Sequence, residues 1–148
     1  MVRRANETEI QAIRALARMA RLLERSSGDL NLAHYRVLSA VAGGDERASR
    51  VAVRLALGKP TVSAAVESLC KRGLLSRADA AEDRRAATLA LTPAGEAALA
   101  AVEAEMLGRL RELTDRTADG TRVLEALGQL GEALDEVADE RLARRLGK

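Results

Sequence analysis

Residues 48–73 read ASRVAVRLALGKPTVSAAVESLCKRG, and within them only Leu57-Gly58 separates two predicted helices, residues 48–56 and 59–72. Two helices joined by so short a connection must cross at a large angle. This crossing is the geometry of a helix-turn-helix, which is therefore the first prediction from the sequence.

The second of these helices has one face turned inward and one left free. Pro60 fits its first turn, where a missing backbone N–H is harmless, and Gly73 is a natural end for it. The apolar stripe expected to face the core consists of Val62, Val66 and Leu69. The opposite face is free to meet another molecule, and it carries Thr61, Ser63, Ala64 and Glu67 or Ser68.

After Gly73 the pattern changes from helical spacing to alternation. Residues 74–77 and 87–91 are predicted strands, and the charged segment 79–85 lies between them. This arrangement predicts a β-hairpin with a long polar tip. Thr92 and Pro93 then start a new helix as its cap and its first residue.

The flanking segments are amphipathic helices. Residues 5–25 and about 31–41 precede the helix-turn-helix, a long helix is expected from 93 to about 117, and a last helix follows. The last helix carries a coiled-coil-like stripe of Val123, Leu127, Leu130, Leu134 and Val137. The apolar residues are mainly Ala, Leu and Val, with one Tyr and no Phe or Trp. Small side chains cover little area each, so the first and last helices have more to gain from a partner subunit than from a small core.

The charge is unevenly distributed along the 148 residues, although the net charge is only +2. Residues 47–85 hold nine Lys or Arg against four acids, whereas residues 119–140 hold seven acids and one Arg. This contrast indicates that one surface meets an anion while another faces water or a partner. Solvated helix faces with uneven charge are the alternative.

Several classes of protein are disfavoured by what the sequence lacks. His34 is the only histidine, so one subunit cannot assemble a catalytic triad or a multi-histidine metal site. No Gly-rich phosphate loop or nucleophile elbow occurs, so we expect neither an enzyme nor a cofactor. The single Cys70 excludes an intrachain disulfide. With no export signal and no apolar stretch of membrane length, a cytoplasmic protein without a membrane partner is expected.

Four motifs in the expected order resemble the MarR family of bacterial transcription regulators. They are LGKPTVS at 57–63, LCKRGLLSR at 69–77, EDRR at 82–85 and LALTPAG at 89–95. The resemblance implies a mainly α winged helix-turn-helix with a β-hairpin wing. It also implies a single unit over 1–148, with a DNA-binding lobe at 31–92 and dimerisation helices at 1–25 and 93–148.

The function implied by the resemblance is transcription regulation, more often repression. A homodimer would bind a pseudo-palindromic site in double-stranded DNA, and a small lipophilic or phenolic effector, or in some members thiol oxidation, would modulate it. A winged-helix module that binds another protein without specific DNA recognition is the alternative from a different class.

The helix at 59–72 would lie in the major groove, where its leading residues reach base edges. The expected DNA-binding residues are Arg54, Lys59, Thr61, Ser63, Ala64, Lys71, Arg72, Arg84 and Arg85. Among them the two hydroxyls and the Ala64 methyl are candidates for reading bases, and the cations at 54, 59, 71 and 72 for touching phosphates. The resemblance implies that Arg85 enters the minor groove and that Asp83 braces the wing. Exposed solubilising charges are the alternative for each cation.

Three further residues have two interpretations each. The resemblance places His34 and Tyr35 near a ligand pocket between the dimer helices and the lobe, whereas a packing or capping role is the plainer interpretation for His34. Cys70 is interpreted as a partly buried small hydrophobic residue, with a redox-sensing thiol as the alternative. Gly58, Arg50 and Ala64 depart from the usual family pattern, and the small residue at 64 supplies no bidentate base contact.

Overall fold

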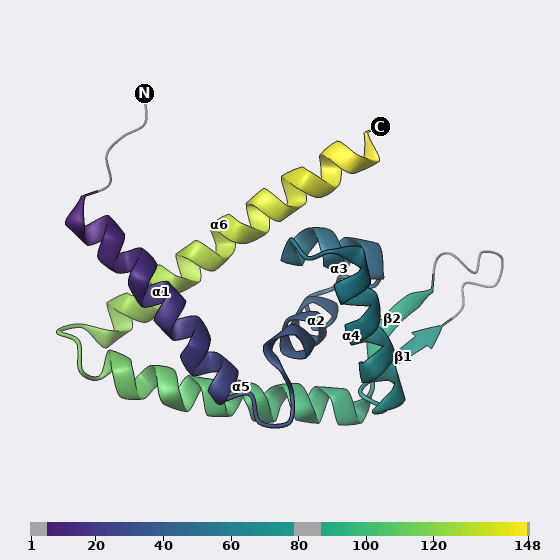
Figure 1. The fold of residues 1–148 in the computed structure, drawn as a ribbon, viewed down its shortest axis with the longest axis horizontal. Coiled ribbons are helices and arrows are strands. Elements are labelled where there is room, and N and C mark those ends of the chain that lie inside the picture. Colours follow the sequence, from purple (N-terminus) through teal and green to yellow (C-terminus); the bar gives the residue numbers. More distant parts are fainter. Residues whose placement is uncertain (1–5, 79–86, 148) are drawn as a thin grey trace.

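The computed structural model describes residues 6–78 and 87–147 of the chain (Figure 1). These residues form a mainly α-helical fold with one antiparallel hairpin, which confirms the predicted fold class. The elements are α1 (Glu7–Arg25), α2 (Leu32–Ala42), α3 (Ala48–Leu55), α4 (Lys59–Lys71), β1 (Leu75–Ala78), β2 (Thr88–Leu91), α5 (Pro93–Thr114) and α6 (Gly120–Leu146). Each boundary lies within a few residues of the one expected from the sequence.

The core lies in the lobe formed by α2, α3, α4 and the hairpin. The largest side chains that are almost fully enclosed there are aliphatic: Leu38, Leu69, Val37, Val51, Val62 and Val66. The inward stripe predicted for the second helix of the helix-turn-helix is therefore confirmed. Because the core is built from small side chains, it fills the space between short helices without needing an aromatic residue.

The connection between α3 and α4 is as tight as its sequence suggested. Ala56 ends α3 in the left-handed conformation, at φ 51° and ψ 38°, although it is not a glycine. Gly58 is the N-cap of α4, and no side chain caps that helix. The backbone at Ala56 thus turns the chain sharply enough for α4 to lie across α3.

The hairpin is anchored to the lobe from both ends. β1 and β2 pair antiparallel, with Leu75 opposite Leu91 and Ala78 opposite Thr88. The backbone N–H of Leu89 donates to the carbonyl of Glu46, at 2.7 Å, so the strand also bonds to the segment before α3. The base of the wing is consequently fixed to the helix-turn-helix.

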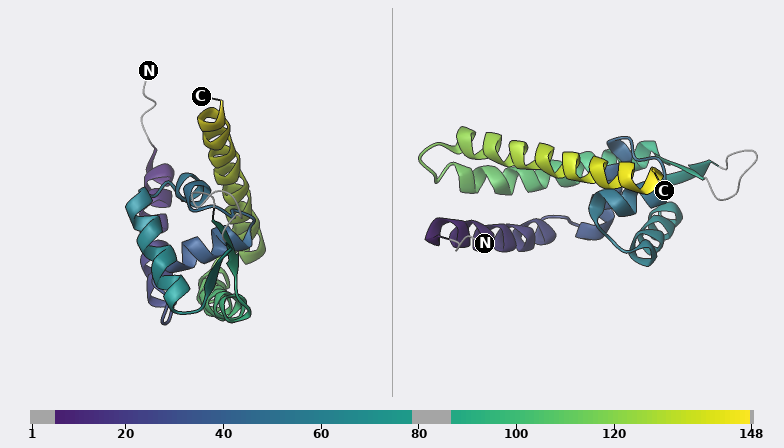
Figure 2. Two further views of the ribbon diagram at one scale, coloured as in Figure 1. Left: turned by 90° about the vertical axis from the view of Figure 1, so that its right-hand side faces the viewer. Right: turned by 90° about the horizontal axis from the view of Figure 1, so that it is seen from above.

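Three long helices extend from the lobe as an arm (Figures 1 and 2). α5 and α6 run antiparallel to each other, and α1 contacts α5. α5 ends at Thr114, before the predicted position near 117, because the N–H of Thr117 donates to the Thr114 carbonyl in a turn, and Asp119 then caps α6.

The arm leaves large apolar side chains exposed. Ile13 is 62% exposed, Leu134 71% and Leu130 55%, and Val137 and Val123 are exposed as well. Most of the stripe expected on the last helix is therefore accessible in the single chain, as partner-facing residues would be.

Candidate nucleic-acid interface

The outer face of α4 carries the residues predicted to read bases. Thr61, Ser63 and Ala64 are all exposed, while Val62 and Val66 on the other side are 1% and 0% exposed. The apolar spacing of α4 alone fixes this division, because burying one side of a helix turns the other outward. The face is small and polar, with two hydroxyls and one methyl.

The amino-terminal end of α4 has no side chain over its free N–H groups. Gly58 offers no capping oxygen, Pro60 occupies the first turn, and Lys59 is exposed beside them. The N-terminus of a helix carries a partial positive charge, so this end of α4 and the Lys59 ammonium are both attractive to an anion.

The other end of α4 is less available than the sequence suggested. The ammonium of Lys71 lies 2.9 Å from the carboxylate of Glu67, one turn earlier, and hydrogen bonding to Lys71 lowers the pKa of Glu67. Arg72 donates from Nη1 to the carbonyl of Asp29, at 3.3 Å, and so connects α4 to the loop after α1. Both cations have protein partners, and Lys59 is the basic residue of α4 for which the structure gives none among the described residues.

Arg54 lies apart from this surface. Its guanidinium binds carboxylates of Asp45, Asp135 and Asp139, and the side chain is only 22% exposed. The expected phosphate contact therefore does not fit the structure, since the positive charge is directed at α6. The charge count includes Arg54 in the basic segment, but it does not reveal that Asp135 and Asp139, more than 80 residues later in the chain, lie against it.

Asp83, Arg84 and Arg85 lie outside the described residues. Their expected roles at the tip of the wing stay predictions from the sequence.

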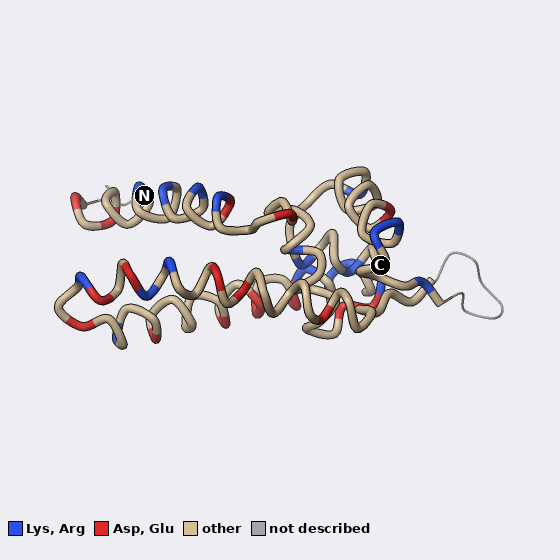
Figure 3. Tube along the Cα trace, turned by 90° about the horizontal axis from the view of Figure 1, so that it is seen from below, with Lys and Arg blue, Asp and Glu red and all other residues tan. Residues whose placement is uncertain are grey.

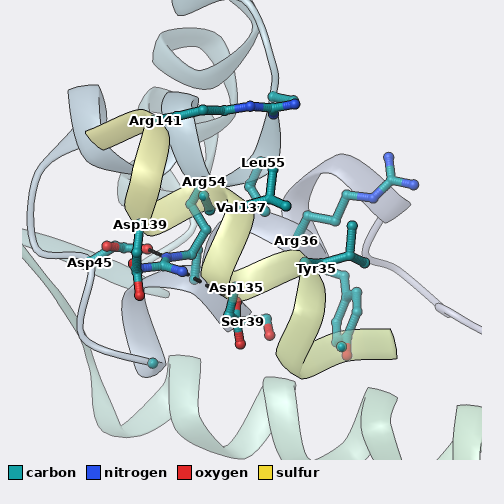
Figure 4. A pocket seen from close by; sticks show the side chains of 16 residues that line it. Tyr35, Arg36, Ser39, Asp45, Arg54, Leu55, Asp135, Val137, Asp139 and Arg141 are labelled. Carbon is teal, nitrogen blue, oxygen red and sulfur yellow. Dashed lines mark hydrogen bonds and ion pairs between the residues drawn. The ribbon is translucent and has the colours of Figure 1, made fainter. Parts of the chain in front are cut away.

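A cavity of about 900 Å³ lies between α2, α3 and α6 (Figure 4). Its lining includes Tyr35, Ser39 and Leu55 from the lobe and Leu134 and Val137 from α6. Burial raises the pKa of Tyr35, and the negative charge of Glu103 raises it further, so the hydroxyl keeps its proton. Tyr35 therefore lines a half-open cavity, and its role in a ligand pocket stays a prediction.

His34, the other expected pocket residue, is not part of the cavity lining. Its backbone N–H donates to the Asn31 side chain, at 2.8 Å, in the cap of α2. Its Nδ1 is buried and has no hydrogen-bond partner. His34 therefore takes part in the start of α2, in agreement with the plainer interpretation. Cys70 is half-buried and packs against the core, which agrees with a small hydrophobic role.

Both signs of charge occur on each of the long helices (Figure 3). Arginines slightly outnumber acids on α1, and acids outnumber arginines on α5 and α6. None of the helices in residues 6–78 and 87–147 combines the length and apolar character that a membrane crossing requires.

A helix-turn-helix followed by an antiparallel hairpin, carried on three longer helices, defines a winged-helix protein. Residues 28–86 match the family model described as the MarR family. No curated protein matches the chain. The resemblance to the MarR family is confirmed, over residues 28–86 by the family model and over most of the chain by the fold.

Three solved structures illustrate the similarity. Apo MarR from E. coli is 20% identical with a TM-score of 0.70, and the alignment covers 86% of this chain and 97% of that one. The transcriptional regulator MOSR of M. tuberculosis, solved with DNA, is 24% identical with a TM-score of 0.60, over 86% and 96% of the two chains. BpsR of Bordetella bronchiseptica, whose DNA binding is regulated by 6-hydroxynicotinic acid, is 21% identical with a TM-score of 0.68, over 86% and 99%.

Proposed function

We propose that this protein is a transcriptional repressor that binds a pseudo-palindromic DNA site as a homodimer and responds to a small ligand. The exposed face of α4, with Thr61, Ser63 and Ala64 beside Lys59, is the observation that carries the proposal. A helix presented in this way fits the major groove. The similar fold of MOSR, which was solved with DNA, supports it.

The arm supports a dimer. Its exposed apolar residues on α1 and α6, among them Ile13, Leu130 and Leu134, would be removed from water by a second copy of the chain. The four Arg of α1 stand beside three Glu, and residues 119–140 hold seven acids and one Arg, so opposite charges are available for pairing between two copies. Two lobes joined by this arm would each present one α4.

The small side chains on the exposed face of α4 predict how the protein recognises a DNA sequence. Hydroxyls and a methyl group make single contacts, and none of them forms the bidentate pair that is worth about 1–3 kcal/mol. Part of the specificity would then come from the shape and deformability of the DNA.

Selection of bound duplexes from a random pool, followed by fluorescence anisotropy, tests DNA binding. We expect a pseudo-palindromic consensus with half-sites about 34–36 Å apart. The double variant Thr61→Ala/Ser63→Ala should lose preference for the selected site over random duplex, whereas Thr121→Ala, which removes an exposed hydroxyl at the start of α6, should bind as the wild type does.

The salt dependence separates phosphate contacts from solvated charge. Lys59→Gln should lower the slope of log affinity against log salt by about 1.8, because each of the two subunits loses one phosphate contact and each contact contributes about 0.9. Arg122→Gln removes one positive charge at the far end of the arm and should leave the slope unchanged. A wild-type protein that ignores every duplex at low salt would overturn the proposal and favour a protein-binding winged helix.

The cavity beside Tyr35 is the proposed effector site. It has an apolar wall from Leu55, Leu134 and Val137, and Tyr35 and Ser39 also belong to its lining, a combination that suits a small lipophilic or phenolic molecule. The ligand regulation of BpsR supports the proposal. Because α2, α3 and α6 all line the cavity, a bound molecule would touch both the lobe and the arm.

Calorimetry with a series of substituted phenols tests this site. We expect binding of at least one phenol, a lower DNA affinity in its presence, and a weaker response in Tyr35→Phe. His34→Gln, which changes a residue outside the lining, should respond as the wild type does. Absence of binding by every phenol up to its solubility would remove the effector from the proposal and leave DNA binding intact.

A further inference from the structure

α6 contacts its own lobe through its carboxy-terminal half, which passes over α3 (Figure 1). Its two buried residues among those described are Ala138, 2% exposed, and Leu142, 8% exposed. Asp135 and Asp139 share that helix face, because residues three and four apart lie side by side on a helix. The contact therefore consists of an apolar patch flanked by two carboxylates.

Arg54 of α3 lies against these carboxylates (Figure 4). Nη1 is 3.2 Å from Asp135 and Nη2 is 2.8 Å from Asp139, while Nε donates to Asp45 in the loop before α3. All three nitrogens of one guanidinium are thus directed at carboxylates from two parts of the fold. Hydrogen bonding to Asp139, followed by that to Asp45, raises the pKa of Arg54.

The buried carboxylate gives the cluster its strength. Asp45 has a side chain only 4% exposed, and a buried charge is costly unless it is paired. Arg54 is its main partner, with Arg50 at 3.6 Å as a second. Asp135 and Asp139 are 68% and 65% exposed, so each of their pairs with Arg54 adds little stability alone. Together the two pairs orient the Arg54 guanidinium toward α6.

The face of α6 that adjoins this contact has a different role. Leu130, Leu134 and Val137 are exposed there, with Leu134 and Val137 at the border of the cavity, and would be covered by the second copy in the proposed dimer. One helix would then be held by its own lobe on one face and by the partner on another. The angle between lobe and α6 would set how far apart the two α4 helices lie.

We infer that Arg54 is a positioning residue: with Asp45, Asp135 and Asp139 it fixes the lobe on α6 and so sets the half-site spacing that the dimer accepts. The inference rests on the proposed function. Arg54 itself touches no DNA in this arrangement. Its loss should therefore change which spacings are bound and leave binding to an isolated half-site unchanged.

The first test measures the distance between the two lobes without DNA. A spin label at Ser63→Cys in a Cys70→Ser background places one label on each α4, and pulsed dipolar spectroscopy reports their separation. We expect one narrow distance distribution for this parent and a broader one for Asp135→Asn/Asp139→Asn. These carboxylates are exposed, so the substitution should leave the fold intact. The control Glu136→Gln/Glu140→Gln removes two charges from the same turns and should keep the narrow distribution.

The second test uses operators in which the half-sites of the selected sequence are moved apart or together one base pair at a time. The wild type and the control should prefer one spacing. Asp135→Asn/Asp139→Asn should bind that spacing about five- to thirtyfold more weakly and discriminate less between spacings. Arg54→Met combined with Asp45→Asn, which leaves no buried carboxylate unpaired, should behave in the same way.

The outcomes separate the two proposals. A wild type that binds no duplex overturns the proposed function, while the label distances still report on the cluster. A wild type that binds DNA but whose Asn variants show the parent's distance distribution and spacing preference overturns the role of Arg54 alone. Equal weakening at a single half-site would also overturn it, because the effect would then lie within the lobe.

Discussion

Gly95 lies in the first turn of α5 directly against the backbone of the segment before β1. A Cβ at this position would overlap the carbonyl oxygen of Leu74, and a carbonyl in the main chain cannot move aside as a flexible side chain can. We expect Gly95→Ala to lower the free energy of unfolding by about 3 kcal/mol. Urea denaturation checks this. Gly108→Ala in the same helix, where nothing lies within 4 Å, should instead raise it by up to about 1 kcal/mol.

His34 gives the stability a pH dependence. Burial lowers its pKa from the ordinary value of 6.5, and the positive charge of Arg72 lowers it further. The folded state therefore binds this proton less readily than the unfolded state does. Stability should be fully present above pH 6.5 and should decline as the pH falls below it.

Denaturation midpoints near pH 7.5 and near pH 5.5 measure this effect. The wild type should lose more stability between the two than His34→Gln, which cannot be protonated there. Equal losses in the two proteins would contradict the role assigned to the half-buried imidazole.

At this scale the sequence predicts residues whose role is local and misses those whose partners are distant. The outward position of Thr61 and Ser63 follows from the spacing of Val62 and Val66 alone. The pairing of Arg54 with Asp135 and Asp139 depends on how α6 returns to the lobe, which no spacing within either segment reveals. Asp135 and Asp139 could have been noticed as an acidic i, i+4 pair, but their partner could not.

Among the elements, the junction of β2 and α5 depends on Thr92. Its Oγ1 accepts from the N–H of Gly95, at 3.0 Å, and donates to the carbonyl of Gly73. Thr92→Val keeps the shape and removes both bonds, so we expect a loss of about 1–2 kcal/mol in unfolding free energy. Thr121→Val, an exposed threonine in α6, is the matched control and should stay within about 0.5 kcal/mol of the wild type.

Element type and order follow from the sequence because the signals are strong. Pro60 and Pro93 mark helix starts, and Gly73 adopts a positive φ of 71° at the end of α4 as expected. The end of α5 is less well predicted. The apolar stripe ends at Leu113, but no Gly or Pro directly after it marks the end of the helix. The helix stops at Thr114 because Thr114 and Thr117 form a turn against Gly120, an arrangement that depends on tertiary contact.

For the whole molecule the expected assembly makes a direct prediction. Leu134 is 71% exposed in the single chain, so Leu134→Glu should not disturb the lobe. It would place a charge in the stripe that the partner covers, and we expect a folded monomer in sedimentation velocity together with loss of binding to paired half-sites. Gln129→Glu introduces the same charge on an exposed position outside the stripe. A dimeric Leu134→Glu protein would place the interface elsewhere.

The extent of the arm could be predicted, but its arrangement could not. The apolar stripes on the first and last helices indicate surfaces that a partner subunit would cover. The side chains of the chain are mostly small, so a single copy cannot bury these stripes in its own core. They do not tell which part of α6 lies on the lobe. Ala138 and Leu142 are buried there in the structure, whereas neither belongs to the stripe that the sequence made prominent.

The left-handed backbone of Ala56 makes the helix-turn-helix less heat-stable than a glycine at this position would make it. A left-handed alanine costs about 1–2 kcal/mol, a penalty that glycine does not incur. Any alanine codon becomes a glycine codon by changing its second base. In a library of random variants of this protein selected for function at raised temperature, Ala56→Gly should therefore be enriched early. The degree of enrichment would measure how far the connection between α3 and α4 can still be stabilised.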